Sequence, residues 1–399
     1  MVTEGGDKVY KERIIAVAAT LLLVLSACAR PATPAPVSKF GLPDPIYIGA
    51  TCEMSGDQAV VGEFLKQGVE LAIKEINESG GIWGSKLAAV YLDDKADPKE
   101  AATVAQRFCS DPRIVAVIGH DFSSCSGAAA PIYDKCGLLQ ISMWSNNPQL
   151  TQRGYKTFFR NIPSDAIQGP EMARVMIQML GAKKVAALTT NNDYGRGLLG
   201  AWEPAVKEMG GQIVESLFYD MDTHKDFSPE ITKIKAAGAE AIAAFCNYSD
   251  GATILRWVET LGYKGHIVLS AGGCHDELIK LAGTAAEGVY GVTYFTLDTT
   301  NSVAKKYAEA FLKEYPKEGI ERASTSAYPY ECVYLVREAI LRAGPGTAEQ
   351  LRKALPAAMH QVKDFLGPTG LNNFDQNGEC VGKGQTIVQV QNGKWTVVP

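Results

Sequence analysis

Residues 113–119 read Arg-Ile-Val-Ala-Val-Ile-Gly, and residues 120–126 read His-Asp-Phe-Ser-Ser-Cys-Ser. The junction between these two stretches indicates the fold class of the chain. The first stretch is a short run of apolar, largely β-branched residues bounded by turn residues, which predicts a strand buried on both faces. The second stretch leads into an alanine-rich segment that we predict to be a helix. Buried strands followed directly by helices are typical of parallel sheets.

The same alternation of strand and helix extends in both directions from this junction. Upstream, strands over residues 46–51 and 87–92 alternate with helices over 61–77 and 98–109, the latter with Asp97 as its N-cap. Downstream, the alternation restarts after residue 160 and continues through the segments 166–180, 184–190, 197–209, 212–218, 231–237, 241–245, 252–261 and 267–270. Two such runs, separated near Ile162, predict an α/β fold with two doubly wound parallel-sheet lobes.

The last hundred residues follow a different pattern. They are predicted to be mostly helical, over residues 303–314, 326–343 and 348–355, before a polar hairpin. The two strands of this hairpin flank Asn392-Gly393, a dipeptide that favours a tight two-residue turn.

Composition limits the classes of partner. The chain has 399 residues, of which 46% are hydrophobic and 21% charged, values typical of a globular protein long enough for two domains. Its formal net charge of −5 gives no basic surface. Nucleic acid is therefore not an expected partner.

The N-terminus has the layout of a secretory signal peptide, which we assign to residues 1–28. Lys8, Lys11 and Arg13 precede a largely apolar run, 14–25, that is too short to span a bilayer. The run ends in Leu-Ser-Ala-Cys28, which resembles the lipobox of bacterial lipoproteins and predicts lipid attachment at Cys28. The alternative is an ordinary signal peptide with a cysteine at its cleavage site. Residues 29–45 contain five prolines and predict an extended tether.

Eight cysteines remain after Cys28, and an exported chain permits disulfides between them. The predicted topology favours two pairs, Cys109–Cys136 and Cys246–Cys274, because each pair ends comparable elements of consecutive βα units. None of the cysteines has Cys-x-x-Cys spacing, and the five histidines show no metal-ligand spacing, so no metal site is expected.

Polar residues gather where strands of the predicted sheets end, and open α/β sheets bind ligands at that edge. Three segments qualify: 119–126, 142–148 and 189–197. In the first, Ser123 and Ser124 lie at a helix N-terminus, where hydroxyls and free amides suit a carboxylate. Simple helix capping is the alternative for these serines. In the third, Tyr194 would project from the second lobe, unless it only packs against the turn.

Catalytic chemistry finds little support in the sequence. Ser123 lies near His120, but there is no Gly-x-Ser-x-Gly motif around it. Walker A and Gly-x-Gly-x-x-Gly motifs are also missing from the sequence. We therefore expect neither an enzyme nor a bound cofactor.

An ordered set of short motifs resembles the type I periplasmic binding proteins of ABC transporters, specifically the branched-chain amino-acid (Leu/Ile/Val) receptor family. The resemblance covers nearly the whole chain after the signal peptide. The motifs are Met54-Ser-Gly56, Ile76-Asn77, Gly80-Gly-Ile82, Asp93-Asp94, Asp97-Pro98, Val117-Ile-Gly-His120, Ser123-Ser124, Pro131-Ile-Tyr133, Leu150-Thr-Gln-Arg-Gly-Tyr155, Asp193-Tyr-Gly195, Lys225-Asp-Phe227 and Ala285-Ala-Glu-Gly288.

The resemblance implies two lobes joined by a hinge of three crossings, with the ligand enclosed between them. The crossings are expected near Ile162, Val292 and Gly370. Lobe 1 would comprise residues 46–162 plus 293–370, and lobe 2 residues 163–292 plus 371–399. Ligand binding would then shift an open population toward a closed one.

The resemblance also implies roles for single residues. Ser123 would bind the ligand carboxylate with help from the Ser124 amide, Asn146 would contact its polar head, and Tyr194 would close onto it from the second lobe. Ser145, beside Asn146 in the second polar segment, is a further candidate.

Several positions depart from the family pattern. The acid that pairs with a ligand ammonium in the family aligns with Ala271, so either Asp121, Asp250 or Asp276 replaces it or the ligand has no ammonium. Trp144 replaces a small residue and could stack on a flat ligand or reduce the pocket. The remaining departures are Asn247 for a tyrosine, Val61 for an aromatic residue, and Ala96 and Phe122 at the positions of the family's disulfide.

The sequence thus predicts a monomeric, extracytoplasmic solute-binding protein, lipid-anchored to a bacterial membrane. It would capture a small carboxylate-bearing ligand, an amino acid or a related organic or aromatic acid, for an ABC permease. The alternative is a lipoprotein of the same fold that senses the ligand and signals to a membrane partner.

Overall fold

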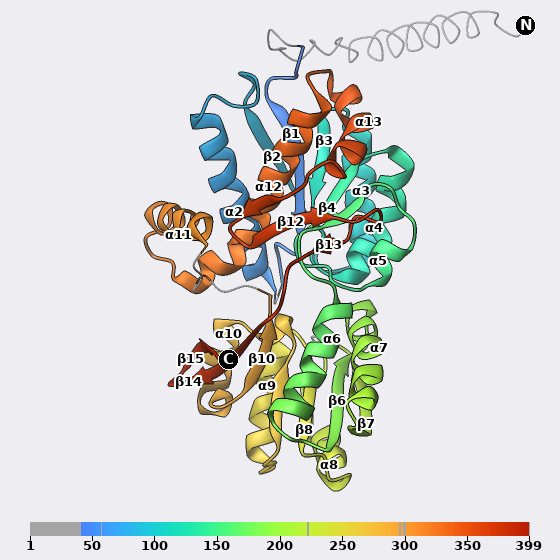
Figure 1. Cartoon of the computed structure of the whole chain (residues 1–399), viewed down its shortest axis with the longest axis vertical. Helices are drawn as coiled ribbons and strands as arrows, with labels where there is room; N and C mark the ends of the chain where they lie inside the picture. Colours follow the sequence, from blue (N-terminus) through green and yellow to red (C-terminus); the bar gives the residue numbers. More distant parts are fainter. Residues whose placement is uncertain (1–40, 57, 222, 295–296, 298–300, 399) are drawn as a thin grey trace, which may run out of the picture. The chain divides into compact units, whose positions relative to one another are not determined.

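The computed structural model describes residues 41–398 apart from 57, 222, 295, 296 and 298–300 (Figure 1). The predicted signal peptide, the lipidation site Cys28 and most of the predicted tether lie outside the described residues. Among the helices that are described, none is long and apolar enough to cross a membrane.

The first sheet is parallel throughout and has five strands in the order β2-β1-β3-β4-β5. Its strands are β1 (Ile46–Cys52), β2 (Leu87–Asp93), β3 (Ile114–Ile118), β4 (Leu139–Ser142) and β5 (Phe158–Arg160). All five residues of β3, the strand at the predicted junction, are buried. Ile118 at its end pairs with Ala50 of β1 and with Ile141 of β4, so these three strands end together.

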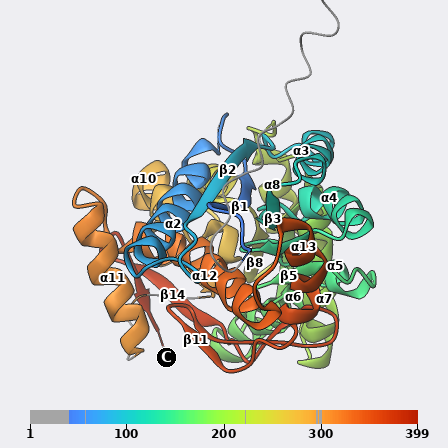
Figure 2. The ribbon, with the colours of Figure 1, turned by 90° about the horizontal axis from the view of Figure 1, so that it is seen from above.

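Helices cover both faces of this sheet (Figure 2). Ile118 packs into a core that includes α2 and α12, whereas its neighbour Val117 packs into a second core beneath α3 and α4. This alternation along β3 is the period-two burial of a strand between two helical layers. The helices are α2 (Ala59–Glu78), α3 (Pro98–Ser110), α4 (Ser123–Cys136), α5 (Gln149–Gln152), α11 (Ser302–Glu314), α12 (Ile320–Ala343) and α13 (Ala348–Met359).

The second sheet has seven strands in the order β15-β14-β10-β9-β8-β6-β7, of which the last five are parallel. They are β6 (Lys184–Thr190), β7 (Gln212–Tyr219), β8 (Ala241–Phe245), β9 (His266–Leu269), β10 (Tyr290–Thr293), β14 (Thr386–Gln391) and β15 (Lys394–Val397). The β14–β15 hairpin turns at Asn392-Gly393, as predicted, with both residues at positive φ.

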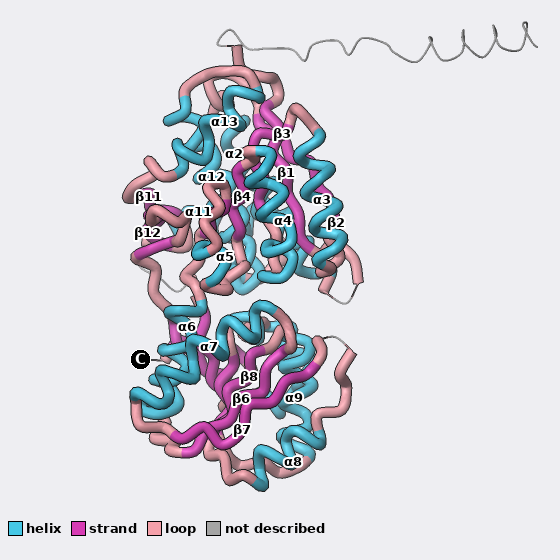
Figure 3. Tube along the Cα trace, turned by 90° about the vertical axis from the view of Figure 1, so that its right-hand side faces the viewer, coloured by secondary structure: helices cyan, strands magenta, loops and turns pink. Residues whose placement is uncertain are grey.

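Helices also cover both faces of the second sheet (Figure 3). Val185 and Ala187 of β6 pack in the core with α6 and α7, and Ala186 and Leu188 pack in the core with α8 and α9. The helical segments are α6 (Asp165–Arg174), η1 (Val175–Met179), α7 (Asp193–Glu208), α8 (Ser228–Ala236), α9 (Tyr248–Thr260), η2 (Ala271–Gly273), α10 (Asp276–Ala282) and η3 (Gly283–Ala286). The predicted α/β fold with two doubly wound lobes is confirmed.

A small antiparallel sheet extends the first lobe. It consists of β11 (Phe365–Gly367), β12 (Gly370–Phe374) and β13 (Cys380–Val381). Phe374 of β12 is buried in the core of the first sheet, so these residues belong with the first lobe. The chain reaches the second sheet only at β14, which places the third passage between the lobes at residues 382–385 and not near Gly370, where we expected it.

A buried ion pair joins two of the passages between the lobes. Lys383, on the third passage, donates to Glu331 Oε1 of α12 at 2.6 Å and to the carbonyl of Asn161, on the first passage, at 2.7 Å. Thr369 Oγ1 donates to the same Glu331 oxygen at 2.7 Å. Because all of these groups are buried, the two passages are held together at the edge of the first lobe.

The cysteine predictions have a mixed outcome. Cys109 near the end of α3 and Cys136 at the end of α4 form the predicted disulfide. The second predicted pair is wrong, since Cys246 and Cys274 are both free thiols. Each lies close to a backbone carbonyl of its own loop, with Cys246 Sγ 3.7 Å from Ala244 O and Cys274 Sγ 3.4 Å from Ser270 O.

Replacing both Cys109 and Cys136 with serine should lower the free energy of unfolding by about 2–4 kcal/mol. The bridge spans 27 residues and restricts the unfolded chain. Urea unfolding of the two proteins measures the difference. A reductant should destabilise the wild type by a similar amount and leave the double variant unchanged; equal stability of both proteins would contradict a structural role.

Candidate functional site

A cavity of about 670 Å³ lies where strands of both sheets end. The first lobe contributes the segments after β3 and β4, and the second lobe contributes those after β6, β8, β9 and β10. This is the edge at which open parallel sheets bind ligands. Seven of the nine residues predicted to bind ligand line it: Asp121, Ser123, Trp144, Asn146, Tyr194, Asn247 and Ala271.

Ser123 is the first residue of α4 and faces the cavity. The N-cap of this helix is Phe122, and no side chain caps it, so the capping alternative for the serines does not apply. Ser123 Oγ accepts the N–H of Asn147 at 3.2 Å, which fixes the hydroxyl and leaves its own proton available to a ligand. The N-terminus of a fourteen-residue helix adds partial positive charge at the same point.

Asn146, Tyr194 and Tyr294 add further polar groups to the lining of the cavity. Asn146 Nδ2 donates to the hydroxyl of Tyr294, which lies 3.4 Å from Gln168 Oε1 of α6. Burial raises the pKa of both Tyr294 and Tyr194 well above the usual value, so both stay neutral phenols. The Tyr294 hydroxyl donates its proton to Gln168, whereas the neutral Tyr194 phenol can donate its proton to a ligand oxygen. Tyr294 was not predicted from the sequence, since it follows β10 without any motif around it.

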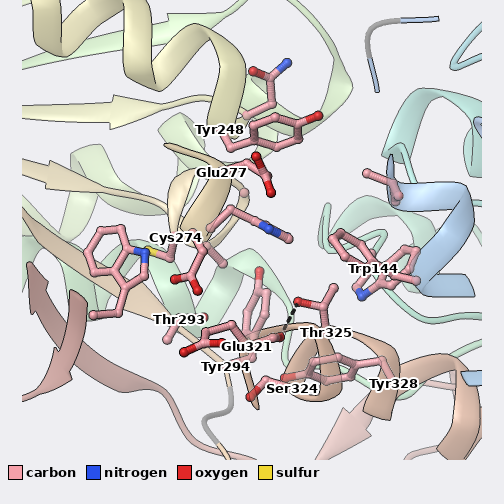
Figure 4. A pocket seen from close by; sticks show the side chains of 18 of the residues that line it. Trp144, Tyr248, Cys274, Glu277, Thr293, Tyr294, Glu321, Ser324, Thr325 and Tyr328 are labelled. Atoms are coloured by element: carbon pink, nitrogen blue, oxygen red, sulfur yellow. Dashed lines mark hydrogen bonds between the residues drawn. The ribbon is translucent and has the colours of Figure 1, made fainter. Parts of the chain in front are cut away.

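Aromatic side chains from both lobes line the rest of the cavity; Figure 4 shows Trp144, Tyr294 and Tyr328 among them. Trp144 also packs against the core of the first lobe. Phe64 of α2 stacks on His275 of the second lobe with 5.1 Å between ring centroids. Burial lowers the pKa of His275 to about 4, so this contact joins two uncharged rings near neutral pH.

Of the two predicted second-lobe residues Asn247 and Ala271, one is polar and the other apolar. Asn247 is the N-cap of α9, and its side-chain oxygen accepts the N–H of Asp250 at 2.7 Å while the residue lines the cavity. Ala271 begins η2 and presents only a methyl group, so no acid stands at this position. No group of three or more histidine, cysteine, aspartate or glutamate residues in the described part of the chain could hold a metal ion.

Comparison with known proteins identifies the fold family. The sequence profile of the family described as "Periplasmic binding protein" matches residues 45–394. The chain belongs to the periplasmic binding protein family. Within this family it is similar to the "Leu/Ile/Val-binding protein homolog 1" of Brucella suis, with 29% identity over 87% of this chain and 91% of the relative.

Two solved structures are similar along nearly their whole length. A leucine binding protein from Thermotoga maritima has 29% identity and a TM-score of 0.82, covering 89% of this chain and 98% of that chain. A branched-chain amino acid transporter substrate binding protein from Streptococcus pneumoniae, solved with isoleucine, has 28% identity and a TM-score of 0.80, covering 89% and 99%. The predicted resemblance to branched-chain amino-acid receptors is therefore confirmed.

Membership of the periplasmic binding protein family settles two general questions. Its members are substrate-binding proteins and not enzymes, as the sequence predicted. They act outside the cytoplasm, so this chain is an extracytoplasmic solute-binding protein.

Two predicted ligand residues of this periplasmic binding protein do not line the cavity. Ser124 is not among the residues that line it, and Ser145 is completely buried. The Ser145 hydroxyl donates to the carbonyl of Asp121 at 2.6 Å and lies 3.1 Å from the carbonyl of His120. Ser145 therefore joins the loop after β4 to the loop after β3, which is a positioning role that sequence spacing does not reveal.

Arg160 is a positioning residue that we did not predict. Its buried guanidinium, at the end of β5, donates to the carbonyls of Ser145 at 3.1 Å and Asn147 at 2.9 Å. Glu379, 219 residues away, accepts from the same guanidinium at 2.7 Å and balances its charge. Arg160 thus holds the backbone of the loop that carries Trp144 and Asn146. The only sequence signal was a charged residue that ends an apolar strand.

Arg160→Met should lower the free energy of unfolding by about 3–5 kcal/mol, because it removes the cation that pairs with Glu379, which then keeps only the Thr151 hydroxyl, and the donor to two backbone carbonyls. Urea unfolding monitors the loss. Arg174→Met is the control, since Arg174 forms a surface pair with Glu171 that is worth about 0–1 kcal/mol. Similar losses in both variants would show that Arg160 has no special role.

Proposed function

We propose that this protein captures a small carboxylate-bearing ligand, an amino acid or a related organic acid, and delivers it to an ABC permease. One observation carries the proposal: Ser123, at the N-terminus of α4, keeps a free hydroxyl proton beside a cavity that Tyr194 faces from the other lobe. Charge-assisted hydrogen bonds of this kind are the strongest available to a neutral site.

The part of the cavity formed by the first lobe contains hydrogen-bond donors that could bind a carboxylate. The first amides of α4 carry no side-chain cap, and they point out of the positive end of the helix. A carboxylate there would accept the Ser123 hydroxyl and these amides together. In this role Ser124 contributes through its backbone amide, which agrees with a side chain that does not line the cavity.

Closure would complete the site. Ser123 and Asn146 belong to the first lobe and Tyr194 to the second, whereas Tyr294 follows β10 and packs against the core of the first lobe. A ligand held by both sets gains its full affinity only when the lobes meet, so it favours the closed form. The passages between the lobes at residues 161–164 and 382–385, together with the one that follows β10, would act as the hinge.

The identity of the relatives and the cavity lining support the ligand class. The names and structures reported above concern leucine, isoleucine and valine. In this chain Trp144, Tyr328 and Phe64 add aromatic faces to the cavity, on which a flat side chain can stack. The ligand class we propose therefore includes branched-chain and aromatic acids.

The partner and the anchor are part of the same proposal. We infer a monomer, tethered to the membrane by lipid on Cys28, that presents its closed form to a permease in the inner membrane. A tether of residues 29–45 would allow the folded lobes to reach that permease without leaving the membrane surface.

A thermal-shift screen of the purified protein against amino acids and aromatic and aliphatic carboxylic acids tests the ligand class. A true ligand at a hundredfold excess over its Kd should raise the free energy of unfolding by about 2.7 kcal/mol. Ser123→Ala should then weaken binding of that ligand by about 10- to 100-fold, as measured by calorimetry.

Ser124→Ala is the matched control, because it keeps the amide and should leave the affinity within about threefold of wild type. An unchanged affinity in the Ser123→Ala variant would show that the carboxylate binds elsewhere. If no carboxylate in the screen stabilised the protein, the proposed ligand class would be wrong.

Cys28→Ala should release the protein from the membrane. A lipid-modified Cys28 would place the wild type in the membrane fraction of cells and incorporate labelled palmitate, since acyl chains supply the membrane affinity. The variant should lose the label. Retention of the wild type in the soluble fraction without label would favour the ordinary signal peptide.

A further inference from the structure

Asp121 differs from the other acids of the cavity. Among the described residues that line it, the acids are Asp121, Asp276, Glu277, Glu318 and Glu321. The last four lie in segments 276–280 and 318–322, which also bring Lys280 and Arg322 to the cavity. Glu277 pairs with Lys280 at 2.7 Å and Glu318 with Arg322 at 2.9 Å. Asp121 follows β3 and has no such cation.

A second carboxyl group lies directly behind Asp121. Glu53, just after β1, is 1% exposed, and neither of its carboxylate oxygens receives an N–H or O–H from the described residues. Its carboxyl group is within hydrogen-bonding distance of Asp121. The neighbouring acid Asp94 is different, because His120 Nδ1 and the Ala96 amide satisfy it. The buried Glu53 and the half-buried Asp121 thus form a pair without a counterion among the described residues.

Two adjacent buried carboxyl groups cannot both ionise, since the second charge would face the first in a medium of low polarity. Burial raises the pKa of Glu53 well above its usual value and that of Asp121 to about 6. Near neutral pH, Glu53 therefore keeps its proton and donates it to Asp121. The pair presents a single negative charge to the cavity, and no described lysine or arginine neutralises it.

We propose that Asp121, supported by Glu53, binds an ammonium group of the ligand, and that the ligand is an α-amino acid. The inference rests on the proposed function, in which Ser123 holds the ligand carboxylate. Asp121 and Ser123 are two residues apart, so their Cα atoms lie within about 7 Å. Neighbouring sites for opposite charges suit a zwitterion whose two charged groups share one carbon.

This assignment accounts for Ala271. Ala271 in the second lobe carries no charge at the position where the family has an acid. Asp121 in the first lobe is an acid that has no counterion in the described part of the chain. The other candidate replacements fit less well. Asp250 does not line the cavity. Asp276 lies beside Glu277 and Glu321 and close to Lys280, so a cation of the protein already interacts with its carboxylate. The ammonium and the carboxylate of the ligand would then both bind the first lobe before the two lobes close.

Binding should consequently depend on pH. Protonation of Asp121 removes the charge that attracts the ammonium, so affinity should fall as the pH falls through about 6. Asp276 lines the same cavity and burial raises its pKa to about 6 as well, so the Asp276→Asn variant separates its contribution to the pH dependence. Burial keeps the thiols neutral, and Asp93 is held ionised by its hydrogen bonds. The groups that interact with Asp121 are Glu53, Asp94, Cys52 and Cys125, with Asp93 beside Cys52 and His120 beside Asp94.

The test compares matched pairs of probes by calorimetry at pH 7.5: L-leucine with 4-methylpentanoate, and L-phenylalanine with 3-phenylpropanoate. Each pair differs only in the ammonium group. The wild type should prefer the better amino acid over its partner by about 100-fold or more. Asp121→Asn, which keeps the shape of the side chain, should remove most of this preference and leave the affinity for the acid within about threefold.

Asp276→Asn is the control and should keep the preference of the wild type. For the wild type, lowering the pH from 7.5 to 5 should weaken binding of the amino acid about tenfold and that of the acid little. Because the wild-type comparison needs no variant, a folding defect in Asp121→Asn would not affect it.

The failures of the two proposals are distinguishable. If the acids bind as well as the amino acids, or if Asp121→Asn keeps the preference, the ammonium site is wrong although the carboxylate site stands. If no standard L-amino acid binds while another carboxylate does, the ammonium site is again wrong. If no carboxylate of any kind binds, both proposals fail.

Discussion

In a parallel sheet, the loops that follow the strands all lie at the same edge of the sheet. The cavity depends on this constraint in both lobes. β1, β3 and β4 end in register, so the loops that carry Glu53, Asp121 and Trp144 must meet. The same holds for β6 and β8, which bring Tyr194 and Asn247 together. A second constraint follows, because loops that meet at an edge need their backbone polar groups satisfied. Arg160 and Ser145 do this in the first lobe.

The parts of the structure that sequence predicted are those with a local physical cause. The β3 strand is an apolar β-branched run, α3 begins at Asp97 because that carboxylate accepts the amides of Lys99 and Glu100, and the last hairpin turns at Asn392-Gly393. The position of Ser123 at the cavity follows from the same local logic, since a helix that starts after a buried strand must start at the sheet edge. These features need only a few neighbouring residues.

The parts that sequence did not predict depend on partners far along the chain. Arg160 and Glu379 are 219 residues apart, and Glu53 is recognisable only beside Asp121, which another strand brings to it. Residues 371–381 were assigned to the second lobe because nothing local shows that Phe374 completes the first core. The Cys246–Cys274 prediction failed for a related reason. The topology places the two loops near each other but does not decide where each thiol points.

Three buried acid–base pairs in the described residues are compensated within the protein. Arg160 faces Glu379, Lys383 faces Glu331, and Asp94 faces His120, each with further hydrogen bonds to the remaining atoms. Such compensation is what removal of charge from water demands. Among the described residues, Glu53 and Asp165 are buried carboxyl groups with neither oxygen hydrogen-bonded, and of these two only Glu53 lies behind an acid, Asp121, that lines the cavity. An acid that has no counterion in the described part of the protein and lines a binding cavity is positioned to pair with a cationic group of the ligand.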